Sequence, residues 1–395
     1  MNTDGWVRTW GASPQMAPGV LGSLETCPAF TDVTLRQVVR ISGGGRQLRI
    51  RMTNEFGTTP LDIGAAHVGL ATPGGGVRPG SGRALTFAGR PTATVATGAL
   101  ILSDPVDLPV PALARLSIDL YLPRRVASCT CHDPALDTGW MIPGDVVAAP
   151  ALPENAGSLP VRALISAVEV LPDSPAEAIV VLGDSRVDGI GSTPDANQSW
   201  PDLLAERLLE RGGAAVYVSN QGISGNRMLN DGLGTSALAR FDRDVLATPG
   251  LGHVVVSAGG NDIAISFAPR DDGGPPAGFL TRFPGEPVTT DEIIAGYRRL
   301  IARAHERGVK IHATTVPPYE DSETFSPAGE RARLAVNAWI RTSGAFDGVM
   351  DFDAMWRDPA RPSRIKDGFH MGDYTHGNDA GYRALAESID LSLFG

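Results

Sequence analysis

Long apolar runs, basic stripes and a leader-like start are all missing from this 395-residue sequence. No apolar run approaches the roughly 18 residues that a membrane-spanning helix needs. Lysine and arginine form no dense stripe and the formal net charge is −10, which argues against nucleic acid or an anionic membrane as the main partner. The first residues, MNTDGWVRTW, lack the basic and apolar regions of a signal peptide. The sequence as it stands therefore predicts a cytoplasmic protein, with secretion after removal of a signal as the alternative.

Cysteine is also scarce, with Cys27, Cys129 and Cys131 only. An odd and small number of cysteines does not indicate a disulfide framework. The cluster CTCH, which includes His132, could bind a metal together with Cys27, but its two-residue spacing is tight. We therefore expect buried thiols at these positions.

The first 172 residues show no helical pattern of convincing length. In RQLRIRMTNEF (46–56) apolar Leu48 and Ile50 alternate with Arg49 and Arg51, which is the period-2 pattern of a half-buried strand. Further short strands are expected at 84–89, 92–98, 100–104 and 115–123, separated by turns rich in glycine and proline. Residues 1–172 are therefore predicted to form an all-β sandwich domain of the jelly-roll type.

The pattern changes in residues 173–395, where apolar runs alternate with amphipathic stretches. Predicted strands lie at 178–182, 214–219, 253–258, 309–316 and 348–352. Predicted helices lie at 199–212, 237–247, 290–308, 327–344 and 378–394. Continuous apolar strands that alternate with helices predict an α/β domain, with a doubly wound parallel sheet covered on both faces.

Polar residues and glycines gather where the predicted strands end. Gly183-Asp184-Ser185 follows the first strand, Gly222 to Gly225 the second, and Gly259-Gly260-Asn261-Asp262 the third, while Asp373 and His376 precede the last helix. In a doubly wound sheet, ligands bind at the carboxyl ends of the strands. We therefore expect these blocks to meet at one edge of the sheet.

The residue types in the blocks are sufficient for acyl transfer. Ser185 would be the nucleophile, activated by His376 as a general base, and Asp373 would orient the imidazole. The oxyanion would be bound by the backbone N–H groups of Ser185 and Gly225 and by the side-chain amide of Asn261. We expect Ser185 to be exposed at the edge of the sheet.

Other interpretations of the same residues remain open. Ser185 could be a capping serine, and Ser224 is a rival nucleophile. His370, Asp373 and His376 could instead form the metal site of a metal-dependent hydrolase. A catalytically inactive carbohydrate-binding protein is a further alternative. No Gly-x-Ser-x-Gly motif is present, which disfavours an α/β-hydrolase.

The blocks resemble those of the SGNH/GDSL hydrolases and occur in that family's order. The resemblance implies a flavodoxin-like fold, an esterase or acylhydrolase activity, and neither a metal nor an organic cofactor. It assigns the nucleophile to Ser185, the base to His376, its orienter to Asp373, and the oxyanion hole to Gly225 with Asn261.

Sequence outside the blocks is similar to a two-domain branch that contains arylesterases and xylan-cluster acylhydrolases. The similar stretches are WGASPQ (10–15), TLRQVVRISGGG (34–45), MTNEFGTTPLDIGAAHVGLA (52–71) and MDFDAMWRDPARP (350–362). The resemblance implies short-chain carboxylic esters as substrates, either acetylated carbohydrates or aryl esters. The branch usually carries an export signal, which is not seen here, and often has proline where this chain has Gly377, which we expect to loosen the loop.

Of the residues predicted to line a substrate pocket, only Asp184 belongs to one of the four blocks. The long stretch from 263 to 290 holds Phe267, Phe279 and Phe283 and is expected to form part of an acyl or alcohol pocket, with a mobile surface flap as the alternative. Deletion of 268–282 should then change the chain-length preference. Trp140, in TGWMIPGD (138–145), is a further candidate. The expected partner is a small ester or acylated carbohydrate, and self-association into a homo-oligomer is an open expectation.

Overall fold

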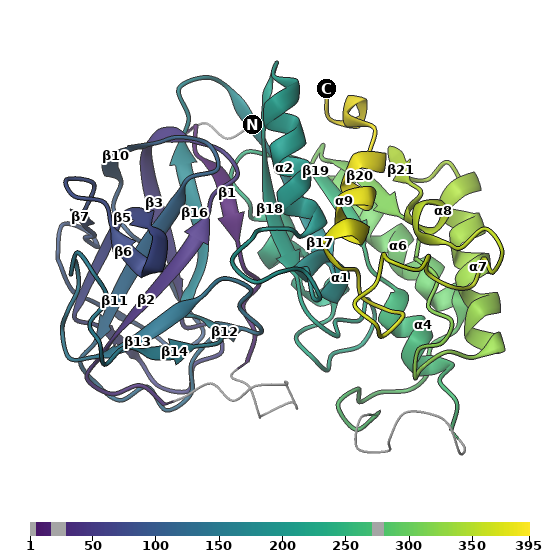
Figure 1. Cartoon of the computed structure of the whole chain (residues 1–395), viewed down its shortest axis with the longest axis horizontal. Coiled ribbons are helices and arrows are strands. Elements are labelled where there is room, and N and C mark those ends of the chain that lie inside the picture. The colour runs from purple at the N-terminus through teal and green to yellow at the C-terminus, as the bar shows by residue number, and fades with distance from the viewer. Residues whose placement is uncertain (1–4, 17–28, 271–279) are drawn as a thin grey trace. The chain divides into compact units, whose positions relative to one another are not determined.

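The computed structural model describes residues 5–16, 29–270 and 280–395. The chain divides into two compact units, Met1–Ala176 with Pro194–Asn197, and Glu177–Thr193 with Gln198–Gly395 (Figure 1). Within the described residues no helix combines the length and the apolar character needed to cross a membrane.

The first unit is built from antiparallel strands. One sheet has the order β1-β16-β3-β10, with β9 paired to β3, and a second has the order β14-β13-β2-β11-β5-β6, with β7 paired to β5. The strands are β1 (Val7–Gly11), β2 (Val33–Arg40), β3 (Gly45–Thr53), β4 (Leu61–Ile63), β5 (Ala65–Thr72), β6 (Gly76–Val77), β7 (Arg83–Ala84), β8 (Ala93–Val95), β9 (Leu100–Leu102), β10 (Val106–Val110), β11 (Arg115–Leu122), β12 (Cys131–His132), β13 (Gly139–Pro143), β14 (Gly157–Leu159), β15 (Arg162–Ala163) and β16 (Ile165–Leu171). The expected all-β first half is therefore confirmed.

A buried ion pair joins the two central strands of the larger sheet. Arg36 of β2 lies opposite Asp119 of β11, and its Nε and Nη2 donate to the two carboxylate oxygens at 2.7 and 2.8 Å. Both side chains are fully buried, and the guanidinium also donates to the carbonyls of Gly75 and Ala149. The pair therefore ties two loops to the sheet.

One predicted strand of this unit is wrong over most of its length. The apolar pattern predicts a strand over 84–89, but β7 ends at Ala84. Ala88 and Gly89 have φ values of 51° and 76°, and Phe87 pairs with Arg90 across them. Positive φ at two successive residues is typical of a tight hairpin turn, so the chain reverses where the pattern predicted an extended strand.

The cysteines correct a second expectation. Cys129 is disulfide-bonded, so the prediction of buried thiols is wrong at this position. Cys131 is a buried free thiol, and burial raises its pKa, with Asp133 acting in the same direction. Cys27 lies outside the described residues. Spacing along the chain does not determine which cysteines meet in space, and only the fold does so.

The second unit contains a five-stranded parallel sheet with the order β18-β17-β19-β20-β21. Numbered from β17, this is the 2-1-3-4-5 order of flavodoxin-like folds, and it confirms the predicted class. The strands are β17 (Ala176–Gly183), β18 (Ala215–Gly222), β19 (Leu251–Ser257), β20 (Lys310–Thr314) and β21 (Gly348–Met350), and the helices are α1 (Ser185–Asp188), α2 (Trp200–Arg211), α3 (Ala237–Phe241), α4 (Gly260–Ser266), α6 (Thr290–His305), α7 (Pro327–Thr342), α8 (Phe352–Trp356) and α9 (Asp379–Ser388) (Figure 1).

Helices cover both faces of this sheet. Alternate strand residues point to opposite faces, and both sets are apolar in β17, so each face needs a covering layer. Val180 and Leu182 of β17 belong to a buried cluster with residues of α6 and α7. Ile179 and Val181 are equally buried but lie outside that cluster. The buried aromatic residues of α2, α8 and α9 also lie outside it and contact one another, as in the pair of Trp200 with Phe352.

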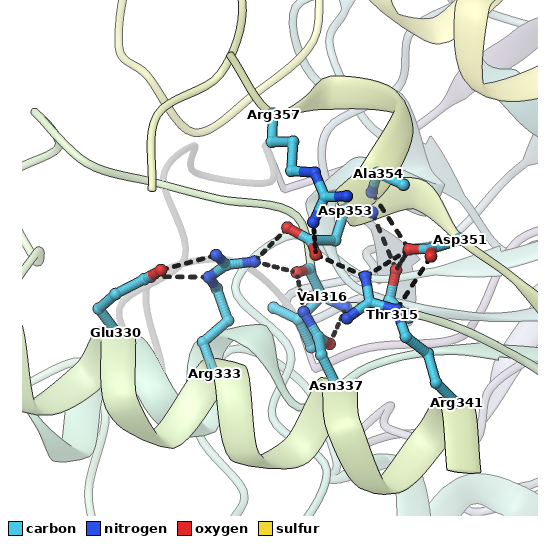
Figure 2. Close-up of polar contacts among 10 residues, drawn as sticks. All are labelled: Thr315, Val316, Glu330, Arg333, Asn337, Arg341, Asp351, Asp353, Ala354 and Arg357. Carbon is cyan, nitrogen blue, oxygen red and sulfur yellow. Dashed lines mark hydrogen bonds and ion pairs between the residues drawn. The ribbon is translucent and has the colours of Figure 1, made fainter. Parts of the chain in front are cut away.

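A buried polar network fixes the chain just after β20, at the carboxyl edge of the sheet (Figure 2). Arg333 of α7 donates to Asp353 at 2.6 Å and to the carbonyl of Val316 at 3.0 Å. Asn337 donates to the same carbonyl at 2.8 Å and accepts from the Val316 N–H at 2.7 Å. Arg341 donates to the second oxygen of Asp353 at 2.5 Å. One carboxylate thus joins two turns of α7 to the start of α8.

Replacement of Asp353 by alanine should destabilise the second unit strongly. Arg333 and Asp353 are each 1% exposed, so the variant leaves the buried guanidinium with Glu330, which is 15% exposed, as its remaining carboxylate partner. We expect a loss of about 2–3 kcal/mol in the free energy of unfolding, measured by urea denaturation, because the charged hydrogen bonds from Arg333 and Arg341 to Asp353 are lost. Asp367→Ala, which removes a carboxylate that is 79% exposed, is the matched control and should leave the unfolding midpoint unchanged. Equal midpoints for both variants would contradict a stabilising role for the network.

Candidate active site

Ser185 is the first residue of α1, directly after β17. The side chain of Asp184 caps this short helix by accepting from the Arg186 N–H at 3.0 Å, and Gly189 ends it with a φ of 106°. The expectation that Ser185 is exposed is wrong, since only 7% of its surface is accessible. Its hydroxyl is covered because it faces the imidazole of His376.

A continuous chain of hydrogen bonds connects three of the predicted residues. Ser185 Oγ lies 2.7 Å from His376 Nε2. The other ring nitrogen, Nδ1, lies 2.5 Å from Asp373 Oδ2. The serine comes from the end of β17, whereas the other two lie in the loop between α8 and α9. The structure therefore brings all three together in the order that acyl transfer by a serine requires.

Asp373 is held as a carboxylate by its own loop. Its Oδ1 accepts from the backbone N–H groups of Thr375 and His376, both at 3.0 Å. Partial burial alone would raise the pKa of Asp373, but the hydrogen bond and charge of His376, together with these N–H groups, outweigh burial and hold the pKa well below its ordinary value. A permanently charged Asp373 favours the tautomer of His376 that carries its proton on Nδ1.

Gly225 occupies a tight turn after β18. The Asn226 N–H donates to the Ile223 carbonyl at 3.0 Å, and Gly225, with a φ of 75°, is the third residue, as a type II turn requires. A Cβ at this position would lie 2.3 Å from Leu233 Cδ1, so no side chain fits. The N–H groups of Gly225 and Ser185 donate to no other described residue, which leaves both free for a ligand.

Asn261 and Asp262 connect α4 to the same turn. The Asn261 side chain donates to the carbonyl of Asn226 at 2.9 Å. Asp262, which is 1% exposed, accepts from the N–H groups of Met228 and Leu229 at 2.7 and 3.0 Å. Burial raises the pKa of Asp262, against the effect of these two N–H groups. Two side chains of the third block thus hold the backbone that follows the second block.

Two features of the histidine loop were missed or misread from the sequence. Arg186 donates from Nε to the carbonyl of Thr375 at 2.9 Å, so the residue after the serine holds the loop that carries the base. Its position directly after Ser185 was the only signal of this role. Gly377 does not loosen the loop as expected. It is buried, and a Cβ there would lie 2.8 Å from the Trp356 ring.

The rival assignments find no support in the geometry. Both nitrogens of His376 are already engaged by Ser185 and Asp373, and His370 Nδ1 accepts from the Gly372 N–H at 3.1 Å. In the described part of the chain no three His, Cys, Asp or Glu side chains are grouped as a metal site requires. The Ser224 hydroxyl donates to the carboxylate of Asp188 at 2.8 Å rather than facing a histidine.

The candidate pocket residues lie on different elements. Asp184 serves as a helix cap. Phe267 directly follows α4, where it packs against the buried cluster, and its carbonyl accepts from Ser326. Trp140 lies in β13 of the first unit, beside Gly75. Phe279 and part of 268–282 lie outside the described residues, so the role of this stretch in substrate binding stays a prediction.

Comparison with known proteins gave one family match. A model described as the GDSL-like Lipase/Acylhydrolase family matches residues 181–384, slightly more than half of the chain. The comparison with curated proteins gave no match.

Among solved structures, the chain is similar to a lipase/acylhydrolase from Enterococcus faecalis, at 21% identity over 54% of this chain and 92% of that one, with a TM-score of 0.38. It is also similar to a GDSL-like lipase from Bacteroides thetaiotaomicron, at 17% identity over 55% and 87%, with a TM-score of 0.39. A carbohydrate acetylesterase family member from Sinorhizobium meliloti matches at 16% identity over 54% and 94%, with a TM-score of 0.39.

Proposed function

Because this chain belongs to the GDSL-like lipase/acylhydrolase family, we propose that it is a serine esterase that hydrolyses short-chain carboxylic esters through an acyl-enzyme on Ser185. The observation that carries the proposal is the hydrogen-bonded chain from Ser185 through His376 to Asp373. Such a chain supplies an activated nucleophile, and the adjacent N–H groups supply a site for the oxyanion.

In the first half of the reaction, Ser185 Oγ attacks the carbonyl carbon of the ester while His376 Nε2 takes the hydroxyl proton. The carbonyl π electrons move to its oxygen, and the resulting oxyanion is bound by the N–H groups of Ser185 and Gly225 and by the Asn261 side chain. When the tetrahedral intermediate collapses, the bond to the alcohol oxygen breaks and His376 returns its proton to the leaving alkoxide.

In the second half, water replaces the alcohol. His376 removes a proton from water, the hydroxide attacks the acyl carbon, and the oxyanion occupies the same site. Collapse releases the carboxylic acid, and His376 returns the proton to Ser185 Oγ. Asp373 remains a carboxylate throughout, since its pKa lies well below the ordinary value, and it stabilises the imidazolium in both halves.

For the substrate, we propose acetyl esters of carbohydrates or aryl alcohols. The support is the similarity of stretches such as WGASPQ (10–15) and MDFDAMWRDPARP (350–362) to the two-domain branch with arylesterases and xylan-cluster acylhydrolases.

The proposal is tested by comparing hydrolysis of p-nitrophenyl acetate, p-nitrophenyl octanoate and acetylated xylan, with and without EDTA. We expect faster turnover of the acetyl esters than of the octanoate, and rates with chelator within about twofold of those without it. A fluorophosphonate probe should add one adduct, located on Ser185 by mass spectrometry of peptides. Loss of activity with EDTA would instead support a metal-dependent hydrolase, and the absence of any hydrolysis would support a carbohydrate-binding role.

A further inference from the structure

A buried arginine outside the four sequence blocks contacts the first block and the residues on either side of the second. Arg240 of α3 is 1% exposed. Its Nη2 donates at 3.0 Å to the carbonyl of Gly183, two residues before Ser185. Its Nη1 donates at 2.8 Å to the carbonyl of Gln221, near the end of β18. One side chain thus joins the carboxyl ends of β17 and β18, and the Ile223 N–H donates to the same Gly183 carbonyl at 3.1 Å.

The same guanidinium orients the residue that follows Gly225. Nε and Nη2 of Arg240 donate to Asn226 Oδ1 at 3.1 and 3.0 Å. At the other end of the amide, Asn226 Nδ2 donates to the carbonyls of Leu233 and Thr235 at 3.3 and 2.9 Å. The Asn226 side chain is therefore fixed on both sides, and the Asn226 N–H closes the turn that contains Gly225.

Asn226 in turn contacts the third donor of the candidate oxyanion hole. Its backbone carbonyl accepts from Asn261 Nδ2 at 2.9 Å. An asparagine amide carries two N–H groups, so the engagement of one sets the direction of the other. Donors of this kind must be placed within about 0.5 Å of the productive geometry. The contacts of Asn226 therefore help to place two donors, the Gly225 N–H and the Asn261 side chain.

The charge of Arg240 is balanced inside the protein. Its Nη1 lies 3.1 Å from Asp244 Oδ2, and both side chains are buried. Burial alone would raise the pKa of Asp244, but Arg243 and Arg240 outweigh burial and hold the pKa below its ordinary value. Hydrogen bonds from a charged donor are stronger than neutral ones. The bonds from Arg240 to the carbonyls of Gly183 and Gln221 are of this stronger kind.

We propose that Arg240 is a positioning residue for the oxyanion hole. Through the Gly183 carbonyl and Asn226, it sets the separation between the N–H groups of Ser185 and Gly225 and the side chain of Asn261. It touches neither substrate nor His376, and it acts on the rate only through these donors. The inference rests on the proposed esterase function.

The test is Arg240→Lys, which keeps a positive charge but replaces a planar fork by a single nitrogen that cannot reach all three oxygens. We expect kcat for p-nitrophenyl acetate to fall about 10²-fold with KM within threefold of the wild type. Inhibition by phenylboronic acid, which forms a tetrahedral adduct on the serine, should weaken by a similar factor. The acid limb of the pH profile of kcat/KM should not move, because the triad is unchanged.

Arg333→Lys is the matched control, because Arg333 is also 1% exposed and also holds a backbone carbonyl at the edge of the sheet. It should lower the unfolding midpoint but leave kcat and inhibition by phenylboronic acid within threefold. If Arg240→Lys does not fold, Asn226→Ala, which leaves the other contacts of Arg240 in place, should show the same kinetic signature. A folded Arg240→Lys or Asn226→Ala variant with wild-type kcat and wild-type inhibition by phenylboronic acid overturns the proposal. An equal loss of kcat in Arg333→Lys also overturns it, as does a shift of the acid limb of the kcat/KM profile in Arg240→Lys.

The outcomes separate this inference from the function on which it rests. If the wild type is active and Ser185→Ala is not, while the Arg240 variant is normal, only the positioning role fails. If the wild type hydrolyses no ester and no probe labels Ser185, the proposed function fails and the inference fails with it.

Discussion

Replacing Ser185 with alanine is expected to lower kcat for ester hydrolysis by a factor on the order of 10⁴–10⁶ while the protein stays folded. The hydroxyl is the atom that would form the acyl bond, and its contact in the site is with His376 at 2.7 Å. Alanine retains the Cβ at a position that is only 7% exposed, so little packing is lost. Steady-state kinetics with p-nitrophenyl acetate measure the loss, and an unchanged unfolding midpoint shows that it is chemical.

The informative comparison is Ser224→Ala. Ser224 lies in the neighbouring block, is 8% exposed and donates to Asp188. Removing its hydroxyl should cost less than about tenfold in kcat, since it faces the carboxylate of Asp188 rather than a histidine. The reverse pattern, with Ser185→Ala active and Ser224→Ala inactive, would transfer the nucleophile to Ser224 and sink the proposed assignment.

The second large effect is expected from Asp373→Asn, with a loss of about 10⁴-fold in kcat. Asp373 Oδ1 accepts from two backbone N–H groups, so the single oxygen of asparagine will be drawn to that side. The amide nitrogen then faces His376 Nδ1 and donates to it. The imidazole must carry its proton on Nε2 instead, and in that tautomer it cannot remove the proton of Ser185.

Asp379→Asn is the control for this change. Asp379, at the start of α9, likewise accepts from a backbone N–H, that of Thr193, at 2.7 Å, but has no contact with His376 among the described residues. Its replacement should leave kcat within threefold. Because the expected defect is one of tautomer, KM for Asp373→Asn should stay near the wild-type value. A mild loss, or a loss shared by Asp379→Asn, would show that Asp373 does not set the tautomer.

The meeting of the blocks was predictable because parallel strands share one carboxyl edge. Ser185, Gly225 and Asn261 each follow a strand of the 2-1-3-4-5 sheet, and the order of strands reverses between β17 and β19, where a ligand is expected. The low exposure of Ser185 was not predictable, since it depends on a histidine that lies 191 residues away. The disulfide of Cys129 escaped prediction for a similar reason, because residue spacing does not show which segments meet.

The sequence did contain a sign that Arg240 is buried, although a search for apolar periodicity does not detect it. Ala237, Arg240, Phe241, Asp244 and Val245 are all buried, and they follow the i, i+3, i+4, i+7, i+8 spacing of one helix face. Two opposite charges four residues apart therefore occupy positions of an apolar stripe. Buried charges are seldom found unless they are paired. Charges placed in this way indicate an internal contact, although only the fold shows that its partners are the Gly183 and Gln221 carbonyls.

The two residues that activate the serine lie in a single loop, and this limits where the chain can change without loss of the site. Asp373 and His376 are three residues apart, and the loop closes on itself, since the Met371 N–H donates to the His376 carbonyl and the Asn378 N–H to that of Phe369. Acid and imidazole therefore belong to one loop, which Arg186 holds from outside through the Thr375 carbonyl. The serine is delivered separately, by the end of a strand. Insertions in loops between residues 186 and 372 are expected to spare the chemistry only where they leave the sheet edge and the contacts of Arg186 and Arg240 unchanged.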